Sequence, residues 1–162
     1  MQEVIVINPE ESKFIEDMGL LMEKSGGSRT LGRIFAYLLL ADSPRTLDQI
    51  AKDLLFSKAT ASLTVRQGIL VKFFEKVTIP GNRKDWYQAN IQNWIGSTSN
   101  QINKIIDWSK VIDQGLGSLS VDNKTALEKM KEMKDYFNFI IWYYSDFGEQ
   151  YQRWKKGEIQ KN

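Results

Sequence analysis

One stretch of the chain, residues 46–89, constrains the fold more than any other. Its first part, TLDQIAKDLLFSKATASLTVRQ, holds two short helical patterns that are separated by a tight corner. Its second part, VTIPGNRKDWYQA, consists of two extended stretches on either side of a Pro-Gly-Asn-Arg turn. A helix pair followed by a hairpin predicts a mainly α fold with a small β-hairpin wing.

Positive charge is concentrated in this same stretch. Residues 57–84 carry six Lys or Arg against Glu75 alone, whereas the net charge of the whole chain is only +2. The first 23 residues instead hold six acidic residues and one lysine. A local cationic surface on a nearly neutral protein indicates a polyanionic partner. Because the parts follow the order of a winged helix-turn-helix, we predict that this partner is double-stranded DNA.

Composition restricts the classes of function. The 162 residues contain no cysteine and no histidine, which excludes thiol and imidazole catalysis and the usual zinc and iron sites. We therefore expect no enzyme, no catalytic residue, no metal and no cofactor. The apolar run that begins at Ile34 is too short to span a membrane, and the acidic start does not resemble a signal peptide, so we expect a cytoplasmic protein without membrane contact. The length allows one domain and an appendage, and the pattern along the chain predicts a winged domain over residues 1–90 and a helical dimerisation region over residues 91–162.

Two helices are predicted before the basic stretch. The first begins at Asn8-Pro9-Glu10-Glu11, where Asn8 can cap, Pro9 suits the first position and Glu11 completes a capping box. It runs to about Lys24 and ends at a Ser-Gly-Gly-Ser break. The second, residues 29–41, is apolar on most sides and is therefore central, with Gly32 allowing a neighbouring backbone to come close.

The helix pair supplies the first set of candidate DNA-binding residues. Thr46 caps the first helix with Gln49 at the capping-box position, and Ser57 starts the second. The 3.6-residue period turns Ala61, Val65 and Ile69 toward the core. The opposite side holds the candidates, which are Ser57, Lys58, Ala59, Thr60, Ser62 and Arg66. Small side chains allow a close approach to base edges, and Arg66 can bind either a guanine or a phosphate. The alternative is that these are ordinary solvated residues.

The hairpin supplies the second set. We expect strands over residues 75–79 and 84–89, joined by a turn over residues 80–83. The candidates at its tip are Asn82, Arg83 and Lys84, which would lie over the sugar-phosphate backbone or in the minor groove. In the alternative interpretation, Arg83 or Lys84 pairs with Asp85.

The last seventy residues predict helices for self-association. A long helix is expected over residues 91–112, interrupted by the polar tract 97–100 and closed by Gly115 and Gly117, and a last helix over residues 122–156. Both helices carry so many apolar side chains that they must pack against another surface. We predict a homodimer whose two winged domains are spaced by one turn of DNA, roughly 34 Å. The alternative is that these helices fold back on their own domain.

Three segments, FIEDMGLLMEKSGGSRTLGRIFAYLLL, LDQIAKDLLFSKATASLTVRQ and VTIPGNRKDWYQA, resemble the GbsR-like branch of the MarR-type winged-helix transcriptional regulators. The similarity covers roughly the first ninety residues. It implies a dimeric DNA-binding regulator in which the helix from Ser57 reads the major groove and Arg83 belongs to the wing. Two positions depart from the family pattern: Gly68 lies inside that helix, and Lys72 stands where a glycine precedes the wing.

We predict a sequence-specific transcriptional regulator, a dimeric repressor that recognises an inverted repeat. A compatible hypothesis adds a small-molecule effector such as choline or glycine betaine, because aromatic rings can cage a quaternary ammonium. The candidates for that cage are Trp94, Trp108, Trp142, Tyr143 and Tyr144. The alternative function is a winged helix that contacts another protein and does not bind DNA productively.

Overall fold

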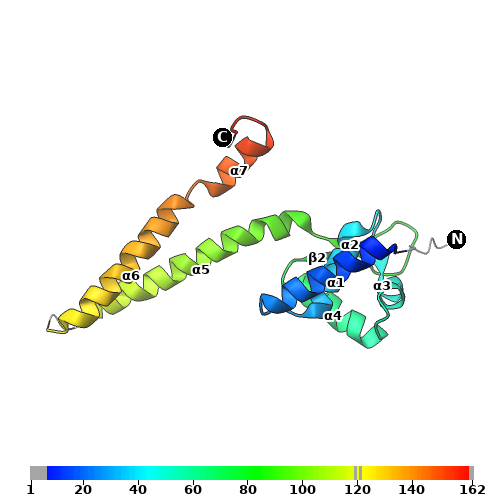
Figure 1. The fold of residues 1–162 in the computed structure, drawn as a ribbon, viewed down its shortest axis with the longest axis horizontal. Coiled ribbons are helices and arrows are strands. Elements are labelled where there is room, and N and C mark those ends of the chain that lie inside the picture. Colours follow the sequence, from blue (N-terminus) through cyan, green and yellow to red (C-terminus); the bar gives the residue numbers. More distant parts are fainter. Residues whose placement is uncertain (1–6, 119, 121, 161–162) are drawn as a thin grey trace. The chain divides into compact units, whose positions relative to one another are not determined.

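The computed structural model describes residues 7–118, 120 and 122–160, together with all their side chains except those of residues 97–100. The chain divides into two compact units, one ending at Trp94 and the other beginning at Ile95. We call them the head and the arm and describe each by itself (Figure 1). Within the described residues, no helix is both long enough and apolar enough to cross a membrane.

The first helix of the head begins where its capping residues predict. The α1 helix (Pro9–Lys24) carries the full capping box, in which Asn8 and Glu11 each accept a hydrogen bond from the other's backbone N–H at 2.9 Å. Gly32 lies in α2 (Arg29–Leu40), where an added Cβ would fall 2.6 Å from a backbone oxygen of α1. The absent side chain therefore lets α1 and α2 pack closely, as the sequence predicts.

The rest of the head is the helix pair and a small sheet. In chain order its elements are β1 (Arg45–Thr46), α3 (Leu47–Asp53), α4 (Lys58–Leu70), β2 (Phe74–Val77) and β3 (Trp86–Ala89). The sheet is antiparallel in the order β1-β3-β2, with Trp86 of β3 paired with both Thr46 and Val77. The hairpin strands are shorter than expected, and β1 was not predicted because a two-residue strand leaves no periodicity in a sequence.

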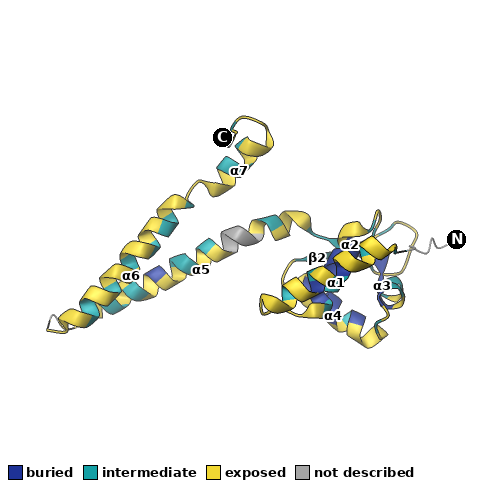
Figure 2. Ribbon diagram, in the orientation of Figure 1, coloured by how far each residue is buried: buried dark blue, intermediate teal, exposed yellow. Residues whose placement is uncertain are grey.

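The core of the head lies around α2 (Figure 2). Its best-buried side chains come from α2, α3, α4 and the sheet: Ile34, Phe35, Ala36, Tyr37, Ile50, Ala61, Val65 and Phe74. The ring of Phe35 lies 5.3 Å from that of Phe73 and 6.3 Å from those of Phe74 and Trp94. The Tyr37 hydroxyl donates to Asp53 at 2.7 Å, and burial raises the pKa of this phenol. The helix pair is thereby packed against α2 at the core of the head.

The end of α4 explains both departures from the family pattern. Gly68 faces the core, and an added Cβ would lie 2.1 Å from the ring of Phe74, so that ring occupies the space of the missing side chain. Lys72 adopts a left-handed conformation with φ of 63°. Its N–H donates to Ile69, and that of Phe73 donates to Gly68 at 2.8 Å, which together form a Schellman motif. The prediction that Ile69 faces the core is wrong, because Gly68 takes that position and Ile69 is exposed.

The described part of the arm contains α6 (Lys124–Tyr143), α7 (Phe147–Lys155) and most of α5 (Ile91–Ser118), whose residues up to Trp94 belong to the head. The backbone of α5 continues through residues 97–100, so the predicted interruption is wrong. The predicted last helix is in fact two. It breaks at residues 144–146, where the Ser145 hydroxyl donates to the carbonyl of Trp142 at 2.8 Å and competes with the helical bonding.

Polar and close contacts join α5 to α6. The Lys134 ammonium of α6 donates to the Ser109 hydroxyl of α5 at 2.8 Å and also pairs with Asp113. A Cβ on Gly115 would lie 2.5 Å from the terminal methyl of Met130, so this glycine lets the two helices approach. The two helices therefore form an antiparallel hairpin within the arm (Figure 1).

Candidate nucleic-acid interface

The second helix of the pair begins with a fully bonded cap. The Ser57 hydroxyl accepts from the backbone N–H of Thr60 at 3.0 Å, and the two hydroxyls lie 2.8 Å apart. Both side chains are exposed and already serve the helix end. Ser57 and Thr60 therefore stabilise the start of α4, and they also lie on the exposed surface where the sequence predicts DNA contacts.

The exposed side of α4 carries most of the predicted residues. Lys58, Ala59 and Arg66 are exposed, whereas Ser62 is half-buried. The opposite side is buried through Ala61, Thr64, Val65 and Gly68. The outer surface thus combines the small side chains of Ala59 and Ser62 with the cations of Lys58 and Arg66, which suits close approach to a groove.

Lys58 has a partner that sequence patterns do not reveal. Its ammonium lies 2.8 Å from a carboxylate oxygen of Asp48, at the start of α3. The bond and charge of Lys58, with a smaller contribution from Lys84, hold the pKa of Asp48 below its usual range. Asp48 therefore partly neutralises one of the cations predicted to meet phosphate, and both groups are solvent-exposed.

The corner between α3 and α4 is held by Arg33 from α2. Leu55 at this corner is left-handed with φ of 57°, and the N–H of Phe56 donates to the carbonyl of Ala51 at 2.8 Å. The Arg33 guanidinium lies 4.6 Å from the centre of the Phe56 ring and 3.4 Å from the carbonyl oxygen of Leu54. It also lies 2.7 Å from Glu16 of α1. Arg33 thus couples α1 to the residues that set the direction of α4.

The wing ends in a tight turn that presents its cations to solvent. The Asn82 N–H donates to the carbonyl of Ile79 at 3.0 Å, with Gly81 at φ of 78°, as expected for a type II turn with proline at its second position. The Asn82 side chain accepts from the N–H of Lys84 at 3.0 Å, so it stabilises the turn itself.

Asp85 does not pair with the cations at the tip. It lies 2.7 Å from the ammonium of Lys76 on β2. Arg83 and Lys84 are exposed, and neither forms an ion pair with another residue that the structure describes. The alternative in which Asp85 neutralises either of them is therefore wrong. Two wing cations and Arg66 remain available to an anionic partner.

The aromatic residues proposed for an effector cage lie in different units. Trp94 belongs to the head, where its ring packs 6.3 Å from that of Phe35. Trp108 lies in the middle of α5, whereas Trp142, Tyr143 and Tyr144 lie where α6 ends. The rings of Tyr143 and Tyr144 meet edge to face at 5.2 Å. In the arm, the rings of Trp108, Trp142 and Tyr143 are exposed and that of Tyr144 is half-buried, and the cage stays a hypothesis.

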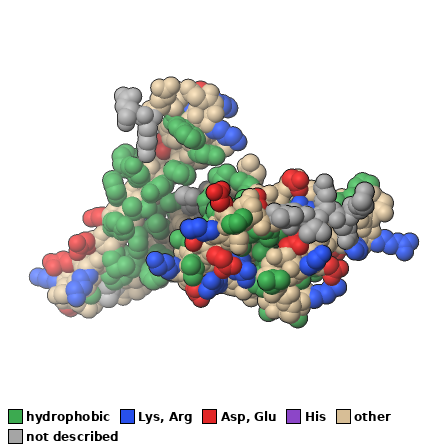
Figure 3. Space-filling view, turned by 45° about the vertical axis from the view of Figure 1, so that its right-hand side comes forward, with side chains coloured by type: hydrophobic (Ala, Val, Ile, Leu, Met, Phe, Trp, Pro, Cys, Tyr) green, Lys and Arg blue, Asp and Glu red, His purple; other side chains and the backbone are tan. Residues whose placement is uncertain are grey.

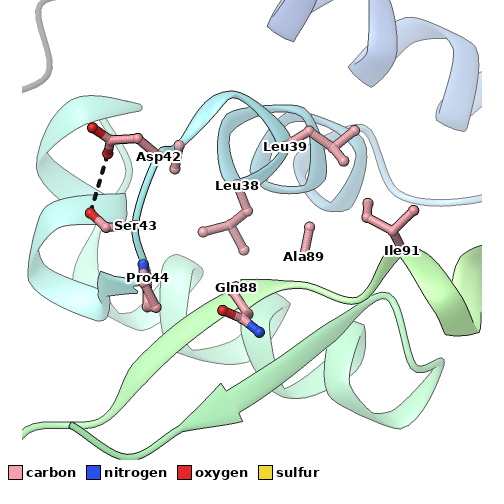
Figure 4. A pocket seen from close by; sticks show the side chains of 9 residues that line it. Leu38, Leu39, Asp42, Ser43, Pro44, Gln88, Ala89 and Ile91 are labelled. Atoms are coloured by element: carbon pink, nitrogen blue, oxygen red, sulfur yellow. Dashed lines mark hydrogen bonds between the residues drawn. The ribbon is translucent and has the colours of Figure 1, made fainter.

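The head also has a shallow pocket of about 300 Å³ beside the end of α2 (Figure 4). Leu38, Leu39 and Ala89 line its apolar side. Its polar residues already bond to others: Ser43 donates to Asp42 at 3.2 Å, Asp42 accepts from Arg45, and Gln88 donates to Glu75. With its polar groups engaged in this way, the pocket gives no basis for assigning a ligand.

Comparison with known proteins agrees with this geometry. No family model matches the chain. HTH-type transcriptional regulator MmpR5 of Mycobacterium tuberculosis is 23% identical over 133 residues, which span 82% of this chain and 81% of that protein. HTH-type transcriptional repressor OpcR of Bacillus subtilis is 28% identical over 151 residues, spanning 85% and 82% of the two chains.

A solved structure described as a transcriptional regulator shares the fold. It superposes with a TM-score of 0.72 at 23% identity and covers 90% of this chain and 99% of its own. The described architecture, a mostly helical chain with a three-stranded antiparallel sheet at the helix pair, matches that of winged-helix regulators. The chain therefore has a winged helix-turn-helix fold and is similar over most of its length to HTH-type transcriptional regulators.

Proposed function

We propose that the protein is a sequence-specific DNA-binding transcriptional regulator, with α4 in the major groove and the wing over the adjacent backbone. The observation that carries the proposal is the exposure of Arg66, Arg83 and Lys84 on the helix pair and wing, free of carboxylate partners among the described residues. MmpR5 is named a transcriptional regulator and OpcR a transcriptional repressor, which supports a role in the control of transcription. A protein that occupies a promoter would repress transcription from that promoter.

The residues divide by the kind of DNA contact that each supports. Arg83 and Lys84 at the exposed turn suit phosphate or minor-groove contacts, which add affinity and carry little sequence information. Ala59, Ser62 and Arg66 lie along α4, where side chains reach base edges. A bidentate contact from Arg66 to guanine would discriminate against a wrong base by about 1–3 kcal/mol.

We propose that the arm joins two copies of the chain. Its helices expose large apolar side chains that form a band in the left-hand part of Figure 3. The large exposed apolar side chains of the arm are Trp108, Val111, Met133, Tyr136, Phe139, Trp142, Tyr143, Phe147 and Trp154. An exposed apolar surface of this extent marks an interface. Two-fold pairing would present two heads to the two halves of an inverted repeat.

We also place the chain in the GbsR-like branch of the MarR-type regulators. The support is the resemblance of the Gly32-Arg33 pair and of the Pro-Gly-Asn-Arg-Lys-Asp turn to that branch. Both motifs have a defined task in the head, since Gly32 allows α1 and α2 to approach and Arg33 holds the corner.

Selection of bound duplexes from a random library, followed by titration with variants, tests the proposal. The full chain should select an inverted repeat, and Arg66→Ala and Arg83→Ala should each weaken binding to it at least tenfold, because each removes a charged contact. Lys13→Ala, which removes an exposed cation of α1 paired with Asp17, is the matched control and should bind as wild type.

The competing function is a winged helix that contacts a protein. If the protein has that function, the full chain should not bind random duplex DNA even at low salt. The two arginine substitutions should then not change the binding measured with DNA. Retention of wild-type affinity by both variants on a selected duplex would remove α4 and the wing from the interface.

A further inference from the structure

The outer side of α4 carries an exposed leucine that the charge pattern does not explain. Leu63 is 55% exposed, whereas its neighbours Thr64 and Val65 are buried. The helical period places Leu63 opposite the core, between Ala59 one turn earlier and Arg66 one turn later. Leu63 therefore lies in the middle of the surface proposed to enter the groove.

The surroundings of Leu63 define the partner. Arg66 lies one turn further along α4 and Lys58 begins the helix, so Leu63 is an apolar point on a cationic helix, which fits a polyanion better than an apolar protein. It lies in the second turn of α4, within the N-terminal half that contacts base edges in helix-turn-helix proteins. Leu70 is even more exposed, but it is the last residue of α4 and lies outside that half.

The major groove offers one apolar group. Base edges there present hydrogen-bond donors and acceptors, and thymine adds its C5-methyl group. We infer that Leu63 packs against a thymine methyl group in the major groove and thereby selects thymine at one position of each half-site. The inference rests on the proposed DNA binding. Ala59 is small enough to let the backbone of α4 come close to the same base edge.

Replacing thymine by deoxyuridine tests the inference because it removes only the methyl group. In the selected duplex, each thymine is replaced in turn, and the affinity of the full chain is measured. At one thymine of each half-site, deoxyuridine should weaken wild-type binding about fourfold, the value of one buried methyl group. Leu63→Ala should bind both duplexes equally, whereas Leu63→Met should keep the preference. Leu70→Ala is the matched control and should also keep it.

The outcomes separate this inference from the proposed function. Tight binding with no thymine sensitive to loss of its methyl group would overturn the role of Leu63 and leave DNA binding intact. An undiminished methyl effect in Leu63→Ala would do the same. A change in oligomeric state of that variant would assign Leu63 to a contact between copies of the chain. Failure to bind any duplex would overturn both.

Discussion

Two glycines in helices differ in what surrounds them. At Gly68 of α4 an added Cβ would meet the buried ring of Phe74 at 2.1 Å, whereas at Gly96 of α5 it would meet no atom within 4 Å among the described side chains and the backbone of other elements. We predict that Gly68→Ala destabilises the protein by about 1–3 kcal/mol through overpacking. Gly96→Ala should stabilise it by up to about 1 kcal/mol through helix propensity. Denaturant unfolding monitored by circular dichroism measures both, and a stabilised Gly68→Ala would contradict the packing of Phe74.

The backbone of Leu55 has a strained left-handed conformation, and its side chain is not buried against the core. Its φ is 57°, and its side chain is 92% exposed at the corner between α3 and α4. Leu55→Gly should therefore raise the free energy of unfolding by about 1 kcal/mol, since the left-handed conformation costs a leucine more than a glycine. Substitution of Val71, whose φ is −86°, serves as control, and Val71→Gly should destabilise. Thermal unfolding of the two variants decides between these results.

Asp48 competes with DNA for Lys58. We predict that Asp48→Asn increases affinity for random duplex DNA and makes the fall of affinity with salt steeper, because one more cation can meet a phosphate. Asp107→Asn removes a comparable exposed pair with Lys110 in the arm and should leave DNA binding unchanged. Weaker binding by Asp48→Asn would show that the pair with Lys58 organises the surface.

The sequence predicted single residues well where a local rule applied. The caps at Asn8, Thr46 and Ser57 follow from hydrogen-bonding side chains next to helical patterns, and the structure confirms all three. Partners from distant elements were missed. Asp48 and Arg33 meet their targets only through the fold, so no spacing along the chain could reveal them.

At the scale of elements, the position of α4 depends on the Arg33 side chain. Arg33→Met keeps the apolar stem but removes the ion pair with Glu16, the bond to the Leu54 carbonyl and the charge over Phe56. We expect a loss of about 1–3 kcal/mol in stability, because the arginine is partly buried and makes several contacts.

The control for this prediction is the neighbouring arginine. Arg29 pairs with the same Glu16 at 2.9 Å but is half-exposed, so Arg29→Met should cost less than about 1 kcal/mol. Urea unfolding measures the free energy of unfolding of both variants. An equal loss in the two variants would show that Arg33 stabilises the head no more than the surface residue Arg29 does.

Helices were predictable from periodicity, and their ends less so. The wing strands are shorter than expected, and the predicted C-terminal helix breaks after Tyr143. Polar residues caused the opposite error in α5, where residues 97–100 remain helical although their side chains favour turns. In both cases the local preference of a few residues does not determine where an element ends.

At the scale of the whole molecule, the apolar band of the arm predicts self-association. Replacing Phe139 and Trp142 together by Gln should shift the full chain toward the monomer, since both rings are more than half exposed on α6. Analytical ultracentrifugation measures the shift. Leu70→Gln places the same polar group on an exposed site of the head and should not change the oligomeric state. An unchanged sedimentation of the double variant would exclude this band as the interface.

The salt dependence of binding to random-sequence duplex DNA shows whether the cationic surface of α4 and the wing contacts phosphates. Arg66 on α4 and Arg83 and Lys84 on the wing are exposed without a carboxylate partner among the described residues, and they predict about six phosphate contacts for a pair of chains. The logarithm of the affinity should then fall linearly with the logarithm of salt concentration, with a slope of about −5. Replacing Arg83 and Lys84 by Ala should flatten this slope markedly. No binding at low salt, or a slope unchanged by that substitution, would contradict the account.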